Sequence, residues 1–136
     1  QRGAADRDAQ GQGARRQVDR MIDGEPQLAC LTLAETCGGR AVETALGLSD
    51  GPNLHPLQTA FMEHFAAQCG FCTSGMLMAA KALLDRNSSP TREDVAEAIS
   101  GNICRCTGYE PIINAILDAA SKHGGRAGGG QGHARV

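Results

Sequence analysis

The chain has 136 residues, enough for one ordinary domain or two small ones, and a formal net charge of −2 at pH 7. Its 13 basic and 15 acidic side chains nearly balance, which argues against a nucleic-acid partner and against a polybasic membrane patch. No apolar run approaches the ~18 residues that a membrane span needs, so we expect none. Aromatic residues make up only 3% of the chain, whereas it contains 6 cysteines. Cysteine chemistry is therefore the leading clue to its stability and function.

Both ends of the chain are expected to be disordered. Residues 1–20 and 123–136 are rich in small and polar residues and show almost no apolar periodicity. Arg15 and Arg16 are not followed by the apolar stretch of a secretory signal, so we expect a cytoplasmic location. In a reducing compartment, paired cysteines are more often metal ligands or redox centres than disulfides.

Residues 21–53 read as short extended pieces. Asp23 and Gly24 predict a turn, an apolar run at 28–31 and an alternating stretch at 41–46 predict strands, and a linker follows at 49–53. Two or three strands of this length are too few to be stable alone, so they need a packed helix or further strands.

Residues 54–122 change to a helical period and predict an all-α unit. Pro56 suits a first helical turn, Thr73 or Ser74 can cap a second helix, and Thr91 with Asp94 resembles a capping box. The pattern predicts four helices, over about residues 56–69, 74–86, 91–100 and 108–123. Short strands followed by helices give an α+β fold class.

Four cysteines fall in two loops between these expected helices. Cys69 and Cys72 form a CxxC pair, and Cys104 and Cys106 form a CxC pair. Four converging thiolates can bind one tetrahedral metal ion, or a cluster in which each iron takes two cysteines. A CxC pair is unusual for zinc, which favours the cluster, while a zinc staple stays open as an alternative and a disulfide pair is less favoured. A thioredoxin-like redox dithiol at the CxxC pair is disfavoured, because no βαβ pattern surrounds these residues.

The residues beside the cysteines suit a buried anionic group. Thr73 and Thr107 offer hydroxyl donors, and Arg105 adds a positive charge. His55 and His64 are expected to cap and pack rather than to ligate a metal. Met76 and Met78 are expected in the core.

Two long motifs carry a family resemblance, QCGFCTSG at residues 68–75 and GNICRCTGY at residues 101–109. The match extends to residues 55–58 and 23–26. In this order and separation they resemble the [2Fe-2S] iron–sulfur (small) subunit of the molybdenum hydroxylase, or xanthine dehydrogenase, family. Its members include the small subunits of aerobic carbon monoxide dehydrogenase and of quinoline and isoquinoline oxidoreductases.

The resemblance implies a fold and a function. It implies a plant-ferredoxin-like β-grasp, partial or truncated here, at residues 21–53 and a four-helix [2Fe-2S]-binding domain at residues 54–122. It also implies electron relay from molybdopterin in a large subunit, through [2Fe-2S] clusters, to FAD in a medium subunit. Gln68 and Cys106 would approach the molybdopterin. The implied cluster ligands are Cys69, Cys72, Cys104 and Cys106.

The chain departs from the family in the cysteines that would bind a second cluster. Cys30 matches the last of four ligands in the family's ferredoxin domain, but no cysteine precedes it. A small core residue is therefore the preferred interpretation of Cys30 over a lone remnant ligand, and Cys37 is expected to be a buried or incidental thiol. Two other functions stay open: a zinc-stabilised helical interaction module without redox function, and a cluster-bearing fragment that cannot complete the electron path.

Overall fold

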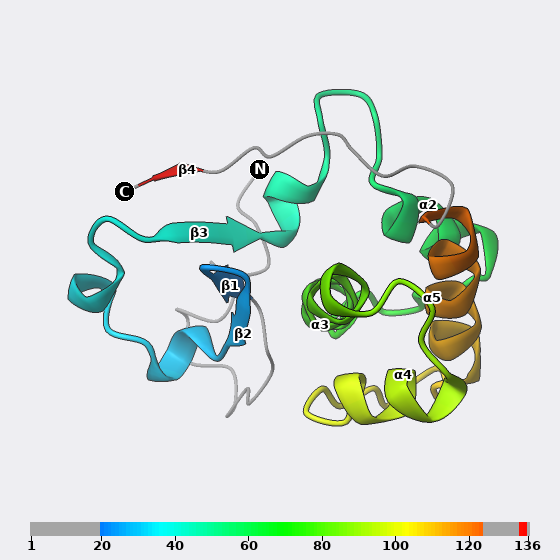
Figure 1. The fold of residues 1–136 in the computed structure, drawn as a ribbon. Coiled ribbons are helices and arrows are strands. Elements are labelled where there is room, and N and C mark those ends of the chain that lie inside the picture. Colours follow the sequence, from blue (N-terminus) through cyan, green and yellow to red (C-terminus); the bar gives the residue numbers. More distant parts are fainter. Residues whose placement is uncertain (1–19, 124–133, 136) are drawn as a thin grey trace.

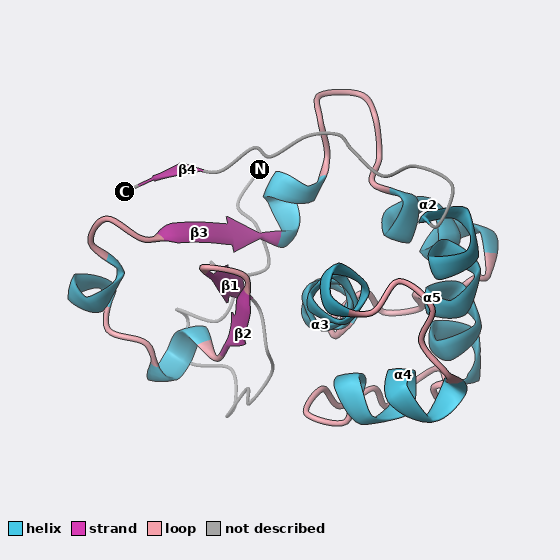
Figure 2. Ribbon diagram, viewed as in Figure 1, coloured by secondary structure: helices cyan, strands magenta, loops and turns pink. Residues whose placement is uncertain are grey.

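The computed structural model describes residues 20–123 and 134–135. The two ends that we expected to be disordered fall mostly outside these residues. A small sheet with three short 3-10 helices lies on one side, and four α-helices lie on the other (Figure 1, Figure 2). The α+β class is as predicted. Of the helices that the structure describes, none combines the length and apolarity needed to cross a membrane.

The sheet has the strand order β2-β1-β3-β4, and every neighbouring pair is antiparallel. Its strands are β1 (Arg20–Ile22), β2 (Glu25–Gln27), β3 (Ala41–Thr44) and β4 (Ala134–Arg135). The predicted turn joins β1 to β2, with Asp23 at φ 52 and Gly24 at φ 80. The Asp23 carboxylate accepts hydrogen bonds from the Ala41 main-chain nitrogen at 2.9 Å and from Arg40 Nε at 2.6 Å. The turn is thereby tied to β3.

The predicted strand at residues 28–31 is wrong. Ala29–Leu31 forms a 3-10 helix, η1, and a second one, η2, spans Ala34–Cys37. Local bonds replace sheet pairing, because the Leu31 nitrogen and the Thr32 hydroxyl both donate to the Leu28 carbonyl oxygen. Leu31 is 75% exposed, so this apolar run does not face the core. The alternating stretch forms β3 but ends at Thr44, where a third 3-10 helix, η3 (Ala45–Leu48), begins.

The four α-helices surround the main core. They are α2 (Pro56–Glu63), α3 (Thr73–Arg86), α4 (Arg92–Ile99) and α5 (Glu110–His123). The fully buried side chains of this core include Leu57, Met76, Val95, Ile112 and Ile116. Helix α3 also packs toward the sheet, where Met21, Met78 and Ala82 form a second buried cluster. The prediction that Met76 and Met78 are core residues is confirmed, since both are 0% exposed.

Two helices begin with the predicted side-chain caps. The His55 ring accepts from the Leu57 nitrogen at 3.2 Å, and Pro56 follows as the first residue of α2. Thr91 and Asp94 form the predicted capping box of α4, with bonds of 2.8 and 3.2 Å. Helix α3 differs: its N-cap is Cys72 rather than Thr73 or Ser74.

Helix α2 ends at Glu63, well before the predicted end near residue 69. The Phe65 nitrogen donates to the Met62 carbonyl and the Ala66 nitrogen to the Phe61 carbonyl, which is the bonding pattern of a Schellman C-cap. Phe65 takes the left-handed position, φ 51, that glycine usually fills. This turn buries Ala66 completely and leaves Phe65 82% exposed. The chain then continues as the loop that carries the first cysteine pair.

A charged network holds the end of α2 against α5. His64 Nε2 lies 3.1 Å from Asp118 Oδ2, and Lys122 Nζ lies 2.8 Å from carboxylate oxygens of both Asp118 and Glu63. The Lys122 ammonium, and after it the His64 ring, hold the pKa of Asp118 below its usual value. His64 thus has the structural role that we expected.

Candidate metal centre

The two loops that carry the four motif cysteines approach each other. Cys69 and Cys72 lie between α2 and α3, and Cys104 and Cys106 lie between α4 and α5. Cys106 Sγ is 3.5 Å from Cys69 Sγ, and Cys104 is near enough to Cys72 to help raise the pKa of the Cys72 thiol. Cys69 and Cys106 are exposed, whereas Cys72 and Cys104 are buried. The site therefore consists of an outer and an inner pair of thiols, each with one member from each loop.

The first loop is shaped by Gly70 and by the start of α3. Gly70 has φ 79, a conformation that a side chain would disfavour, and its carbonyl accepts from the Thr73 nitrogen at 3.3 Å. The Cys72 carbonyl then accepts the first main-chain bond of the helix, from Met76, at 2.9 Å. Cys72 is thus fixed by the helix start, while Cys69 precedes the glycine turn.

The second loop is held by two residues that sequence reasoning did not assign. Asn102 is 1% exposed, and its Nδ2 donates to the Gly75 carbonyl oxygen in α3 at 3.2 Å. The Tyr109 hydroxyl accepts from the Cys104 nitrogen at 2.9 Å and donates to the Asn102 carbonyl oxygen at 3.5 Å. Both residues stand in the GNICRCTGY motif, but only the folded chain shows which groups they join.

Thr107, which the sequence predicted to offer a hydroxyl donor, contacts the buried thiol of Cys104. Its Oγ1 lies 3.0 Å from Cys104 Sγ, and its main-chain nitrogen donates to the same sulfur at 3.4 Å. Burial raises the pKa of Cys104, but the two Thr107 bonds and further hydrogen bonds outweigh it and lower that pKa overall. Arg105, the expected positive charge, is exposed.

The other thiols differ in acidity for local reasons. A hydrogen bond from the Phe71 main chain and another from Cys106 lower the pKa of Cys69. The hydrogen bond between the Cys106 and Cys69 thiols raises the pKa of Cys106. Burial raises the pKa of Cys72 to about 12. A metal ion that binds a thiol removes its proton outright, so these differences describe the metal-free site.

The donor set suits a two-iron cluster. A [2Fe-2S] cluster takes four cysteine ligands, two per iron, and the two loops together supply four thiols, of which Cys69 and Cys106 are in contact. Among residues 20–123 and 134–135, no group of three or more Cys, His, Asp or Glu side chains is placed to hold a metal ion. Thr73 Oγ1, one residue from Cys72, is buried and has no hydrogen-bond partner among the described residues. A sulfur atom of a bound cluster would be an acceptor for this hydroxyl.

The remaining predicted residues lie outside this group. Gln68 is exposed beside Cys69. Cys30 is exposed, so its preferred interpretation as a core residue is wrong: it sits in η1, whose apolar side chains face outward. Cys37 is half-buried, and its thiol lies 3.7 Å from the Leu33 carbonyl oxygen.

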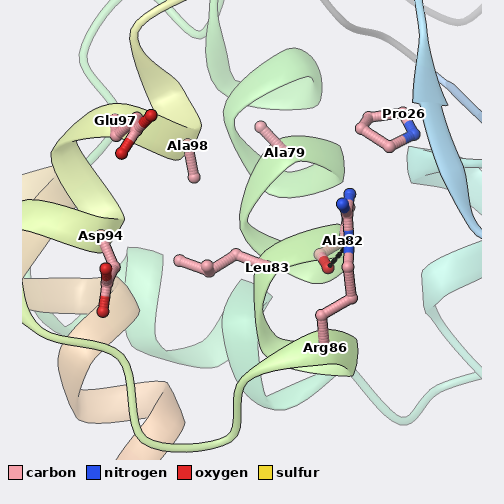
Figure 3. A pocket seen from close by; sticks show the side chains of 8 residues that line it. All are labelled: Pro26, Ala79, Ala82, Leu83, Arg86, Asp94, Glu97 and Ala98. Carbon is pink, nitrogen blue, oxygen red and sulfur yellow. Dashed lines mark hydrogen bonds between the residues drawn. The ribbon is translucent and has the colours of Figure 1, made fainter.

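A cavity of about 270 Å³ lies elsewhere, between β2, α3 and α4 (Figure 3). Alanine and leucine side chains form much of its wall, with Arg86 on one side and Asp94 and Glu97 on another. Arg86 donates to the Ala82 carbonyl oxygen at 3.2 Å and pairs with Glu25 at 3.8 Å. No cysteine lines this cavity, so it is separate from the four-thiol site.

Comparison with known proteins identifies the family. Residues 44–117, which include all four cysteines, match the family model described as a [2Fe-2S] binding domain. The chain is 54% identical over 108 residues to the nicotine 6-hydroxylase small subunit of Paenarthrobacter nicotinovorans, covering 79% of this chain and 65% of that subunit. It is 43% identical over 109 residues to the aldehyde oxidoreductase of Megalodesulfovibrio gigas, covering 78% of this chain and 12% of that protein. The chain thus spans less than two thirds of these curated relatives.

A solved structure agrees in fold. The crystal structure of quinoline 2-oxidoreductase from Pseudomonas putida 86 matches with a TM-score of 0.75 and 48% sequence identity, over 80% of this chain and 71% of that chain. The expected resemblance is therefore confirmed, and the zinc-stabilised module receives no support. This chain belongs to the [2Fe-2S] binding domain family and, within it, to the iron–sulfur small subunits of the molybdenum hydroxylases.

Proposed function

We propose that this chain is the electron-transfer subunit of a molybdenum-containing oxidoreductase. The observation that carries the proposal is the pairing of four thiols across two loops, one pair buried and one exposed, inside the matched domain. The names of its relatives, hydroxylases, dehydrogenases and aldehyde oxidoreductases, support the reaction class. The substrate would be bound by a partner subunit, because this chain would contribute no substrate chemistry.

Residues 54–122 would form the four-helix [2Fe-2S]-binding domain, with Cys69, Cys72, Cys104 and Cys106 as ligands. A [2Fe-2S] cluster supplies one-electron transfer when it is bound. The protein would do the rest: the α3 start and the Tyr109 bond would fix Cys72 and Cys104 before metal binds. Phe71, half exposed in the first loop, would keep water from the thiols.

The exposed side of the site would face a large subunit that holds molybdopterin. Gln68 and Cys106 would lie nearest to that cofactor. Support comes from apolar side chains exposed near the two loops: Phe65 is 82%, Ile103 71% and Phe71 50% exposed. If these side chains form one continuous apolar surface, that surface would favour contact with a partner protein. Electrons would continue to FAD in a medium subunit.

Residues 21–53 would be the remnant of a ferredoxin-like β-grasp. Cys30 would be a candidate ligand for a second cluster in that domain.

The deciding experiment measures iron, acid-labile sulfide and zinc per chain after anaerobic purification, with EPR of the dithionite-reduced sample. We expect about two irons, two sulfides and one rhombic signal, as one [2Fe-2S] cluster requires. About four of each, with two signals, would show a second cluster. Zinc without sulfide would overturn the proposed function.

A further inference from the structure

Thr107 makes two different contacts through one oxygen atom. The Tyr109 main-chain nitrogen donates to Thr107 Oγ1 at 3.1 Å, and the same oxygen lies 3.0 Å from Cys104 Sγ. These contacts depend on an unusual backbone, because Gly108 and Tyr109 both have φ 69. A tyrosine in this region is uncommon and costs free energy, so other contacts must hold it there.

The side chain of Tyr109 provides those contacts. Its hydroxyl bonds to the Cys104 nitrogen at 2.9 Å and to the Asn102 carbonyl oxygen at 3.5 Å. The Tyr109 main chain and side chain therefore act together, one on Thr107 and the other on Cys104. The loop has little freedom to turn the threonine hydroxyl elsewhere.

The direction of the hydrogen bond to sulfur follows from these contacts. A hydroxyl has one proton and two lone pairs, and the Tyr109 N–H takes a lone pair of Thr107 Oγ1. A cysteine that binds metal is a thiolate and has no proton to donate. Once Cys104 is a ligand, the Thr107 hydroxyl is therefore the donor in its contact with Cys104 Sγ.

We propose that Thr107 sets the reduction potential of the iron–sulfur centre through its hydroxyl bond to Cys104, with Tyr109 as the positioning residue. The inference rests on the proposed function and deepens it. A donor on a ligand sulfur stabilises the extra negative charge that reduction brings, and hydrogen bonds to sulfur are among the factors that set cluster potentials. Charge-assisted bonds of this kind are stronger than neutral ones, and the inner thiols are shielded from water.

The test is a redox titration, followed by EPR, of the full 136-residue chain purified with its cluster. Thr107→Val keeps the branched shape and removes the hydroxyl, while Thr107→Ser keeps the hydroxyl. We expect the ratio of reduced to oxidised cluster in the valine variant to be about tenfold lower at a fixed potential near the midpoint, which equals a shift of about 59 mV for a one-electron couple. We expect the serine variant to titrate close to the wild type. Thr59→Val, a half-buried threonine of α2, is the matched control and should leave the potential unchanged.

Each remaining result overturns the proposal. An unchanged potential in Thr107→Val, or an equal shift in Thr59→Val, would show that the hydroxyl does not act on the centre. If valine impairs packing, Thr107→Ala is titrated instead under the same criterion. Loss of the cluster from both hydroxyl-free variants, with retention in Thr107→Ser, would assign the hydroxyl to building the site rather than to its potential.

Failure of this inference is distinguishable from failure of the proposed function. A wild-type chain without iron and sulfide would remove the proposed function itself. A wild-type chain with two irons and two sulfides, whose potential does not respond to Thr107→Val, would remove only the role of Thr107.

Discussion

The Asn102 side-chain amide links the two cysteine loops, because its Nδ2 donates to the Gly75 carbonyl oxygen 3.2 Å away in the first turns of α3. The two residues are 27 positions apart, and Asn102 is 1% exposed. A buried polar contact of this kind fixes one loop relative to the other. It joins the segment that follows Cys72 to the segment that precedes Cys104.

Asn102→Ala should lower the free energy of unfolding by about 1–3 kcal/mol. The substitution removes the side-chain hydrogen bond to the Gly75 carbonyl oxygen and leaves a void where the buried amide was. Urea denaturation followed by circular dichroism measures the loss. Asn53→Ala, at an exposed position of the 49–53 linker, should change stability by less than about 0.5 kcal/mol. Equal effects of the two substitutions would contradict the linking role of Asn102.

The two buried thiols should react at different rates in the metal-free chain. Alkylation requires the thiolate, and the pKa of Cys72 is raised to about 12 by burial whereas hydrogen bonds lower that of Cys104. The two side chains are similarly accessible to a reagent, 5% and 8% exposed, so access does not explain a difference in rate. Iodoacetamide at pH 8, with peptide mapping by mass spectrometry, should label Cys104 before Cys72.

Raising the pH should accelerate Cys72 labelling throughout the range up to about 12, since its thiolate fraction keeps growing there. The exposed Cys69, whose pKa is lowered chiefly by the Phe71 main-chain bond, should be labelled early at pH 8. Similar rates for Cys72 and Cys104 would refute the assignment of their environments.

Asp118 should contribute a pH-dependent part of the stability. Bonds to Lys122 and His64 lower the pKa of Asp118 below its ordinary 3.8, so the unfolded chain binds more protons in that range. Its contribution is fully present above pH 3.8 and is lost as pH falls through the lower folded pKa. Asp118→Asn should therefore be less stable than wild type near pH 6, and the gap should narrow in acid.

Urea denaturation at several pH values from 6 to about 2 measures this gap. Asp50→Asn, at an exposed linker carboxylate, serves as the comparison and should show a smaller gap near pH 6. A gap for Asp118→Asn that stays constant as the pH falls would speak against the network.

Phe65→Gly should stabilise the chain by about 0.5–1 kcal/mol. A non-glycine residue pays about 1–2 kcal/mol for the left-handed conformation, and the extra freedom of glycine in the unfolded chain offsets only part of this gain. Phe65 is 82% exposed, so little burial is lost. Thermal unfolding measures the change. Met62→Ala, also an exposed apolar side chain of this region, should not stabilise, and a destabilised Phe65→Gly variant would count against the strain at this C-cap.

The cysteines should divide into two classes by metal content. Cys104→Ser should lose the iron and sulfide of the chain, because the site has no spare thiol among the four. Cys30→Ser and Cys37→Ser should retain both, since neither residue belongs to the four-thiol site. Iron and sulfide assays on the three variants decide this. Loss of iron in Cys30→Ser would instead assign that residue to a cluster.

Several elements were predictable because their signals are local. The turn at Asp23 and Gly24 and the capping box of Thr91 and Asp94 depend on residues at most three positions apart, and the structure contains both. The apolar run at 28–31 could not be assigned from local signals, because a short apolar run is compatible with a strand or a helical turn. Which of these forms depends on whether a neighbouring strand is placed to pair with it. The early end of α2 was missed for a related reason: its cap uses a phenylalanine where glycine is the usual signal.

The family and the expected ligand cysteines follow from the sequence, since the spacing and order of the two cysteine motifs are properties of the chain alone. The folded chain is needed to see which thiols are in contact, which are buried, and that Asn102, Thr107 and Tyr109 surround Cys104. The reason is physical: a hydrogen bond between residues far apart along the chain depends on how the helices pack. Packing also sets the burial that makes Cys72 and Cys69 so different in acidity.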